Sequence, residues 1–394
     1  MNNFTRLIIV IYVLRMFMPL FGLIPSPVVI LMAIYILLKL ITNGRTQWVK
    51  STMPHLLVIY LLLVITDVLV RPLSSLGNAL YAHAILWVLP FIFLHIYHNN
   101  DTKLAKVLLY TVVLATAITA FTTYLGCVRF PGISRQMATG QLDIQLPKFL
   151  NIGGFDTIYI FVLMIPMLGY RLKYCKIRWL EKVTILATII MIFMAVFQSE
   201  YTTAIIFSII AITTLFLPPN IRWGKMIILL ILIAIIVAVS INYLSSLLFY
   251  LSDNIDSLSV SGRLKGLALM LQGQEGTNAD ESDVQGRLEL IIEALEAFSS
   301  SPILGVQKIV GGHSYIADII AYYGIFGLVM LIVYFRKLRK LFAKCFESCH
   351  CSSAVITTEI IYLCFLILNP RLYLIVPFLF LPIFSYYNDK TIKS

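Results

Sequence analysis

Charged residues are scarce in this chain: they make up 12% of its 394 residues, whereas hydrophobic residues make up 60%. An ordinary soluble domain carries roughly 25% charged residues, so the composition excludes that class. Segments of short alternating hydrophobicity, which are typical of a membrane β-barrel, are also absent. Apolar runs such as 7–23, 183–197 and 226–239 are long enough, alone or with their flanks, to cross about 30 Å of hydrocarbon as helices. The sequence therefore predicts an all-α integral membrane protein.

The apolar runs and the polar stretches between them predict about twelve transmembrane helices. The Pro25-Ser-Pro27 turn makes the first two a tight hairpin. The expected helices are roughly residues 5–22, 26–42, 54–70, 79–97, 104–126, 154–170, 183–199, 202–217, 226–249, 314–335, 354–368 and 373–387. The chain thereby divides into residues 1–249 with transmembrane helices, 250–313 as a large polar loop with short helices, and 314–394 with the last helices and a tail.

No single basic patch stands out, although the formal net charge is +11. Lysine and arginine concentrate in short loops such as 171–182 and 336–344, where they set the topology and contact anionic lipid. This distribution argues against nucleic acid as a partner and indicates membrane lipid. Because basic residues favour the cytoplasmic side, we expect both termini there and the 250–313 loop on the opposite side.

The six cysteines lack the spacing of a secreted disulfide framework. Those in the 345–351 segment lie beside His350, and together these residue types resemble a metal-ligand set. Their loop is expected to face the cytoplasm, where thiols stay reduced. We therefore predict an inert cluster and no metal site.

The extracytoplasmic side carries few charges, and most of them are arginines. Positive charge there opposes the topological bias and so needs a reason. One reason is a polyanionic ligand, since guanidinium groups bind phosphate or pyrophosphate in a bidentate manner. The alternative is contact with lipid headgroups or solvent. The basic residues on this side are Arg71, Arg129, Arg135, Lys148, Arg263, Lys265, Arg287, Lys308 and Arg371.

Within the large loop, apolar residues recur at helical spacing over 288–298, with three glutamates on the opposite face. The pattern predicts an amphipathic helix that begins near Gly286 and ends at the Ser-Ser-Ser-Pro stretch 299–302. Such a helix either lies on the membrane surface or covers the bundle.

A second Gly-Arg-Leu triplet, at 262–264, precedes another short apolar helix expected at 264–271. Both Arg263 and Arg287 are then predicted near helix N-termini, where backbone N–H groups also favour anions. The acidic segment 272–285 between the two helices is expected to be flexible and solvated.

His313 lies where the large loop re-enters the membrane, after two glycines that allow a close approach of backbone and substrate. A histidine there can act as a general base near neutral pH, or donate to a phosphate when protonated. The alternative is a histidine that only anchors the interface.

Four strings between 286 and 330 resemble one family: Gly286-Arg287, Pro302-Ile-Leu-Gly305, Gly-Gly-His313-Ser-Tyr315 and Ala-Tyr-Tyr-Gly-Ile-Phe-Gly-Leu at 321–328. The pattern is similar to that of the bacterial O-antigen polymerase and ligase superfamily, which contains the Wzy-type polysaccharide polymerases and the O-antigen ligases.

Three departures from the family pattern accompany this resemblance. Leu290 and Ile291 occupy a region where tryptophan is frequent, and Ser314 follows the histidine where asparagine is common. The mid-chain stretch 198–203 lacks the arginine of a Ser-Arg-Thr string, which leaves one expected phosphate contact open to Arg129, Arg135 or Arg371.

The resemblance implies a GT-C-type glycosyltransferase of the bacterial inner membrane, working at the periplasmic face without metal or another cofactor. Its substrate is then an undecaprenyl-pyrophosphate-linked oligosaccharide, and a chain-length-regulating co-polymerase is an expected partner. Catalytic roles fall to His313, as base or acceptor orienter, and to Arg287, on the pyrophosphate. Substrate contacts are expected from Arg263, Arg371, Arg129, Arg135, Arg71 and Tyr315.

A polysaccharide polymerase is the favoured member of this superfamily, because polymerases are the more varied and numerous. An O-antigen ligase, which transfers glycan to lipid A-core, differs only in its acceptor and stays open. A lipid-linked oligosaccharide flippase is a third alternative, although one large loop breaks the symmetry of two related halves. A non-enzymatic membrane assembly protein leaves the extracytoplasmic arginines and His313 unexplained.

Overall fold

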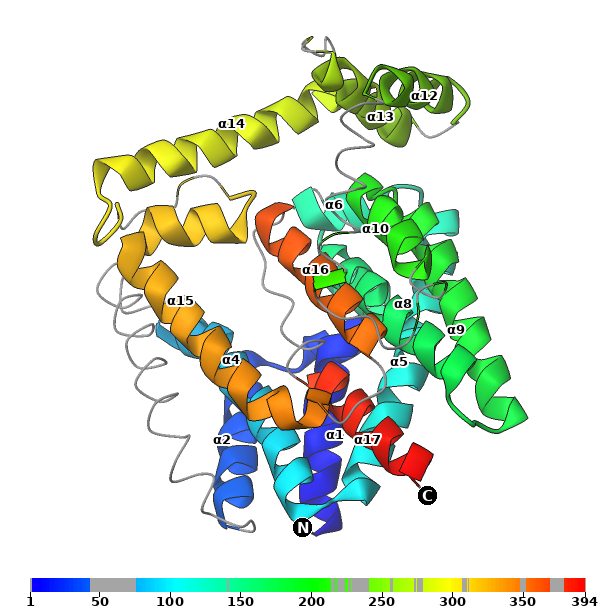
Figure 1. The fold of residues 1–394 in the computed structure, drawn as a ribbon, viewed down its shortest axis with the longest axis vertical. Coiled ribbons are helices and arrows are strands. Elements are labelled where there is room, and N and C mark those ends of the chain that lie inside the picture. Colours follow the sequence, from blue (N-terminus) through cyan, green and yellow to red (C-terminus); the bar gives the residue numbers. More distant parts are fainter. Residues whose placement is uncertain are drawn as a thin grey trace.

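The computed structural model describes residues 2–42, 76–139, 142–213, 241–255, 258–272, 279–306, 312–347, 352–368 and 379–393, together with a few isolated positions between these ranges. Every regular element in these ranges is a helix, so the predicted all-α class is confirmed for this part of the chain (Figure 1).

The N-terminal hairpin contains two helices and a short 3-10 turn. Helix α1 (Asn3–Phe17) begins after Asn2, whose side-chain oxygen accepts the N–H of Thr5 at 2.9 Å. It ends before Pro19, because a proline ring clashes with the preceding helical turn. The expected single helix over 5–22 is therefore wrong: η1 (Pro19–Leu23) follows the break, and α2 (Ser26–Thr42) packs back against α1.

The centre of the bundle is α8 (Phe155–Tyr174), which is buried continuously from Ile158 to Arg171. A helix that is apolar on all sides must be surrounded by other helices or lipid. It packs against α9 (Trp179–Gln198), α10 (Thr202–Thr213) and α16 (Ser352–Leu368). The remaining helices of the bundle are α4 (Leu76–Asn99), α5 (Thr102–Arg129) and α17 (Leu381–Lys393).

Three helices of the described chain, α5, α8 and α9, are long and apolar enough to cross a membrane. Shorter apolar helices include α2, α10 and α16. The expected helix at 54–70 and most of residues 226–240 lie outside the described residues, whereas residues 241–249 of the helix expected at 226–249 belong to α12 (Ile241–Asp253). The total of about twelve transmembrane helices and the GT-C arrangement therefore stay predictions.

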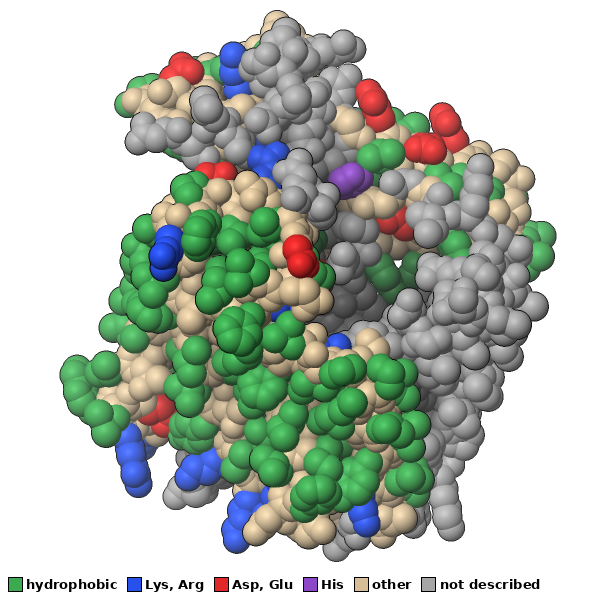
Figure 2. Space-filling model, turned by 180° about the vertical axis from the view of Figure 1, so that it is seen from behind, with side chains coloured by type: hydrophobic (Ala, Val, Ile, Leu, Met, Phe, Trp, Pro, Cys, Tyr) green, Lys and Arg blue, Asp and Glu red, His purple; other side chains and the backbone are tan. Residues whose placement is uncertain are grey.

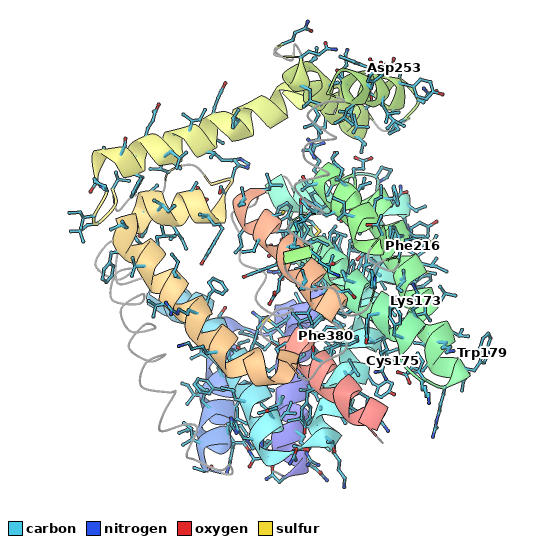
Figure 3. The ribbon with its side chains drawn as sticks, viewed as in Figure 1. Lys173, Cys175, Trp179, Phe216, Asp253 and Phe380 are labelled. Carbon is cyan, nitrogen blue, oxygen red and sulfur yellow. The ribbon has the colours of Figure 1, made fainter. Side chains whose placement is uncertain are left out.

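The kinds of exposed side chain change along the length of the bundle. Figure 2 shows hydrophobic side chains over the middle of the visible face, with lysine and arginine side chains gathered toward its lower edge. At that lower part Trp179, which is 75% exposed, projects away from the bundle at the start of α9, not far from Lys173 (Figure 3). Tryptophan at the end of an apolar helix is typical of a membrane–water interface.

The opposite end carries the helices of the large loop. Helices α12 (Ile241–Asp253), α13 (Leu258–Leu271) and α14 (Ala279–Ser300) lie there, far from both chain termini (Figure 1). One short helix of the bundle, α6 (Ile133–Thr139), reaches the same end (Figure 1), and another, α7 (Gln145–Phe149), packs against η1.

Both helices of the large loop begin earlier than predicted. Helix α14 starts at Ala279 rather than Gly286, so half of the segment expected to be flexible is helical. Its acidic opening, Asp-Glu-Ser-Asp at 280–283, suits the positive end of a helix dipole. Helix α13 likewise starts at Leu258. Arg263 and Arg287 therefore lie inside their helices, and the prediction that they sit near N-termini is wrong.

Helix α15 (Tyr315–Glu347) is broken at Gly324, whose φ of 64° and ψ of −158° are not helical. The part before Gly324 lies beside α14 across the end of the bundle, and the part after it descends along the bundle (Figure 1). The transmembrane helix expected over 314–335 thus divides into a surface segment and a descending segment.

Candidate functional site

Those residues predicted for the site that the structure describes lie on several elements of the end that carries α13 and α14. Arg263 on α13 is buried at 9% exposure, whereas Arg135 on α6 is half-buried. Arg129, in the last turn of α5, is exposed, and its guanidinium carbon lies 5.6 Å from the centre of the Phe130 ring. Arg71 and Arg371 fall outside the described residues, and the side chain of Arg287 does too.

His313 occupies a short loop immediately before α15 and is half-buried. Tyr315, the first residue of α15, packs against the main hydrophobic core. Ser314 is the residue before the helix: its hydroxyl accepts the N–H of Ala317 at 3.3 Å, and its carbonyl accepts the N–H of Asp318 at 2.8 Å. His313 is thereby fixed to the end of a helix that is itself anchored in the bundle.

Asp318 holds Gly312, the residue before His313. Its Oδ1 accepts the backbone N–H of Gly312 at 2.9 Å. Gly312 has a φ of 95°, a conformation that glycine adopts without the strain of a Cβ atom. Burial raises the pKa of the Asp318 carboxyl, and the Gly312 N–H together with the nearby charge of His313 partly offsets this rise.

The Pro302-to-Gly305 turn crosses α15 at its break, backbone against backbone. The N–H groups of Ile325 and Phe326, which begin the descending part of α15, donate to the carbonyls of Pro302 (2.8 Å) and Ile303 (3.3 Å). A helix N-terminus has unsatisfied N–H groups, and here the turn supplies their acceptors. Val306 N–H also donates to the Ala321 carbonyl at 2.9 Å.

Two glycines make this crossing possible. A Cβ on Gly324 would lie 2.4 Å from the Ile303 carbonyl oxygen, and one on Gly305 would lie 2.3 Å from that of Tyr322. Both residues also have positive φ. The Pro-x-x-Gly and Gly-Ile-x-Gly strings of the sequence are therefore two halves of one contact, which fixes the end of α14 to α15.

A third polar cluster joins α6 to the turn between α9 and α10. The Tyr201 hydroxyl donates to the Ser134 carbonyl at 2.6 Å, and the Ser134 hydroxyl donates to the Gly153 carbonyl at 2.7 Å. Burial raises the pKa of Tyr201 well above its usual range, and the Arg263 guanidinium opposes part of that rise. Arg263 thus lies within electrostatic range of Tyr201, while Arg135 follows the Ser134 carbonyl that Tyr201 contacts.

This cluster bears on the mid-chain stretch that lacks an arginine. The turn between α9 and α10 includes Glu200, which has a φ of 61° although glycine or asparagine is usual in that conformation. Asp156, in the first turn of α8, adds a carboxylate whose charge acts on Tyr201. Of the predicted arginines, Arg263 acts on this turn electrostatically, and Arg135 follows the residue whose carbonyl contacts it.

Chemically, this end combines a histidine that can move a proton with arginines that can neutralise a departing anion. Among the residues that the structure describes, no group of three or more His, Cys, Asp or Glu side chains is placed to hold a metal ion.

Sequence reasoning missed Asp318 and Tyr201 as parts of this end. Asp318 carries a local signal, because an acidic residue in the first turn after a serine N-cap is a common helix start. Tyr201 carries no such signal, since its partner Ser134 is far away in the sequence.

No family model matches this chain, and no curated protein matches it either. The resemblance to O-antigen polymerases and ligases therefore rests on residues 286–330 and stays a prediction.

Proposed function

We propose that this chain is a polysaccharide polymerase of the Wzy type in a bacterial inner membrane. It transfers a growing glycan from undecaprenyl pyrophosphate to a hydroxyl of the next lipid-linked repeat unit. The observation that carries this proposal is the placement of His313 within the 286–330 pattern. It lies in an anchored loop beside α14, at the end of an apolar bundle opposite the chain termini.

The reaction requires the acceptor hydroxyl to lose its proton while the glycosidic bond to pyrophosphate breaks. His313 accepts the proton, and the acceptor oxygen forms the new bond to the anomeric carbon. The bonding electrons leave with the pyrophosphate, which remains attached to undecaprenol. Arg287, with Arg263 and Arg135, neutralises the charge that develops on this leaving group.

The apolar surface of the protein supports a lipid-linked substrate. Leu288, Ile292 and Leu295 form an exposed apolar stripe on α14, at 42–49% exposure. The opposite side of α14 packs through Ala294 against Ala317 and Ala321 of α15. Its apolar stripe gives a polyprenyl chain in the outer leaflet a surface beside the His313 loop.

The test is reconstitution of the purified protein with lipid-linked repeat units, followed by separation of products as a glycan ladder. Wild-type protein is expected to give a ladder and His313→Gln to give none. His98→Gln is the matched control, because His98 lies in the last turn of α4 and not at the end of the bundle that carries His313. A folded His313→Gln protein with a normal ladder would contradict the role of His313.

Two other outcomes separate the alternatives. If wild-type protein gives no ladder but transfers glycan to lipid A-core, the chain is a ligase. If it moves the lipid-linked unit across the bilayer without forming glycan bonds, it is a flippase.

A further inference from the structure

The loop that carries His313 is closed by a single residue of α15. Asp318 accepts the Gly312 N–H through its side chain, at 2.9 Å, and donates its own N–H to the Ser314 carbonyl, at 2.8 Å. One bond precedes His313 and the other follows it, so both neighbours of the histidine are fixed to Asp318. The backbone on either side of His313 then has little freedom to move relative to α15.

The charge of Asp318 is not needed for this closure. A neutral asparagine at 318 has a side-chain oxygen that can accept the same N–H. The carboxylate is instead an energetic cost, because partial burial raises the pKa of Asp318. A nearby positive charge offsets this cost, and the charge of His313 is the side-chain charge that lowers the pKa of Asp318.

Carboxylates on the helices that pack against α15 do not act on Asp318. Helix α14, which packs against this segment, carries Glu289, Glu293 and Glu296, and all three are exposed. Helix α16 also packs against α15 and carries the half-buried Glu359. None of these carboxylates contributes to the pKa change of Asp318.

We propose that Asp318 is a positioning residue for His313: its carboxylate closes the 312–318 loop and stabilises the imidazolium that forms when His313 takes a proton. The catalytic part of this inference rests on the proposed function, whereas the pairing of Asp318 with His313 does not. A carboxylate that orients a histidine and supports its charged form is a recurrent device in enzymes that use a histidine base.

A purely structural role makes different predictions. An acidic residue in the first turn stabilises a helix through the helix dipole. If that were its whole function, Asp318→Asn would weaken α15 and leave His313 unaffected. Ser314→Ala is the matched control, because it removes the bond from Ala317 N–H to the Ser314 hydroxyl but leaves the bond between Asp318 and Gly312.

The direct test is histidine NMR on protein labelled at its six histidines and reconstituted in lipid nanodiscs, with His313→Gln used to assign the His313 signals. In Asp318→Asn, the His313 signals are expected to titrate at lower pH than in wild type. In Ser314→Ala they are expected to titrate as in wild type. Unchanged His313 titration in both Asp318→Asn and Asp318→Ala would overturn the pairing.

The glycan ladder supplies the second readout. Asp318→Asn is expected to lower kcat about 10- to 100-fold while KM for the lipid-linked unit stays near the wild-type value. Asp318→Glu is expected to recover part of the rate, because it restores the charge. If wild-type protein makes no ladder, the proposed function fails, but the NMR titration still decides whether Asp318 acts on His313. A normal rate in Asp318→Asn would overturn the catalytic part alone.

Discussion

The two ends of the molecule satisfy their charged groups in different ways. At the end that holds the chain termini, Arg171 is 3% exposed and its guanidinium donates to Glu181, with an Nε–Oε1 distance of 2.7 Å. The second oxygen of Glu181 accepts the Tyr110 hydroxyl at 3.0 Å, and the Arg171 guanidinium lies over the Tyr387 ring. The charge of Arg171 is thus neutralised by a directly bonded partner of opposite sign, Glu181.

The opposite end has residues with strained backbone and buried titratable side chains. Glu200 and Gly324 have positive φ there, and burial raises the pKa values of Tyr201 and Asp318. Strained backbone and perturbed titratable groups cost free energy, and they concentrate at sites of binding and catalysis. A positive φ also occurs at the end with the termini, at Asn100 (φ 51°), so the two ends differ in how their charged groups are held. Glu181 is held by an opposite charge, whereas the Asp318 side chain is held by a backbone N–H. On this basis we expect the end with the termini to serve stability and the end with His313 to serve chemistry.

The largest effect is expected where the strained end is held together. Gly324→Ala places a Cβ 2.4 Å from the Ile303 carbonyl oxygen, in a φ/ψ region that is essentially restricted to glycine. We expect destabilisation of roughly 3 kcal/mol or more, and hence little folded protein. Yield of monodisperse protein and the thermal midpoint of tryptophan fluorescence measure this.

Gly132→Ala is the control for that substitution. Gly132 also has a positive φ, of 74°, but its Cβ would meet nothing within 4 Å. The cost is then limited to about 1 kcal/mol for a left-handed alanine. Equal losses in the two variants would show that the backbone crossing contributes nothing beyond the positive φ.

The next effect tests the end that is arranged for stability. Glu181→Ala leaves the buried guanidinium of Arg171 without its carboxylate partner, which is expected to cost about 3 kcal/mol because Glu181 itself is partly exposed. The activity of each folded molecule should stay near the wild-type value, because Glu181 is remote from His313. Glu293→Ala, which removes an exposed carboxylate, is expected to shift the thermal midpoint very little. Loss of activity in the folded fraction of Glu181→Ala would break the comparison between the ends.

A smaller effect, confined to activity, is expected for Arg263→Ala. Removal of this buried guanidinium should lower the rate of ladder formation about 10- to 100-fold, since it takes positive charge from the site of the leaving pyrophosphate. Arg129→Ala is the matched variant, because Arg129 is exposed and stacked on Phe130. Although the sequence predicted a substrate contact for Arg129, its exposure leads us to expect a rate within about twofold of wild type. Similar losses in both variants would mean that the burial of Arg263 does not distinguish it from an exposed arginine.

Local patterns account for what was predictable from the sequence. The hairpin turn at 25–27 and the helix at 26–42 follow from proline at a helix start and an unbroken apolar run. The early start of α14 was missed because the acidic 279–285 segment has no apolar face, although its charges suit a helix N-terminus. In this segment, the favourable interaction of acidic residues with the helix dipole outweighs the absence of an apolar face.

Contacts between distant segments could not be predicted in the same way. Gly305 and Gly324 appear in the sequence as separate glycine strings, and only the folded chain places each against the backbone of the other. The same holds for Tyr201 and Ser134. Of the candidate site, His313 could be found from the sequence and Asp318 carries a local signal, whereas the contact that fixes α15 to the 302–305 turn depends on tertiary structure.

The smallest effect, on stability alone, comes from Asp318→Asn. A carboxyl whose pKa is raised in the folded state is destabilising when ionised, so this contribution appears as pH rises above the ordinary aspartate value of 3.8. Asparagine carries no charge at any pH and still accepts the Gly312 N–H. The thermal midpoint of Asp318→Asn at neutral pH is therefore expected to equal or slightly exceed that of wild type, although its rate falls. A clearly lower midpoint would place Asp318 with Arg171 and Glu181 as a stabilising residue, and the contrast between the two ends would no longer include it.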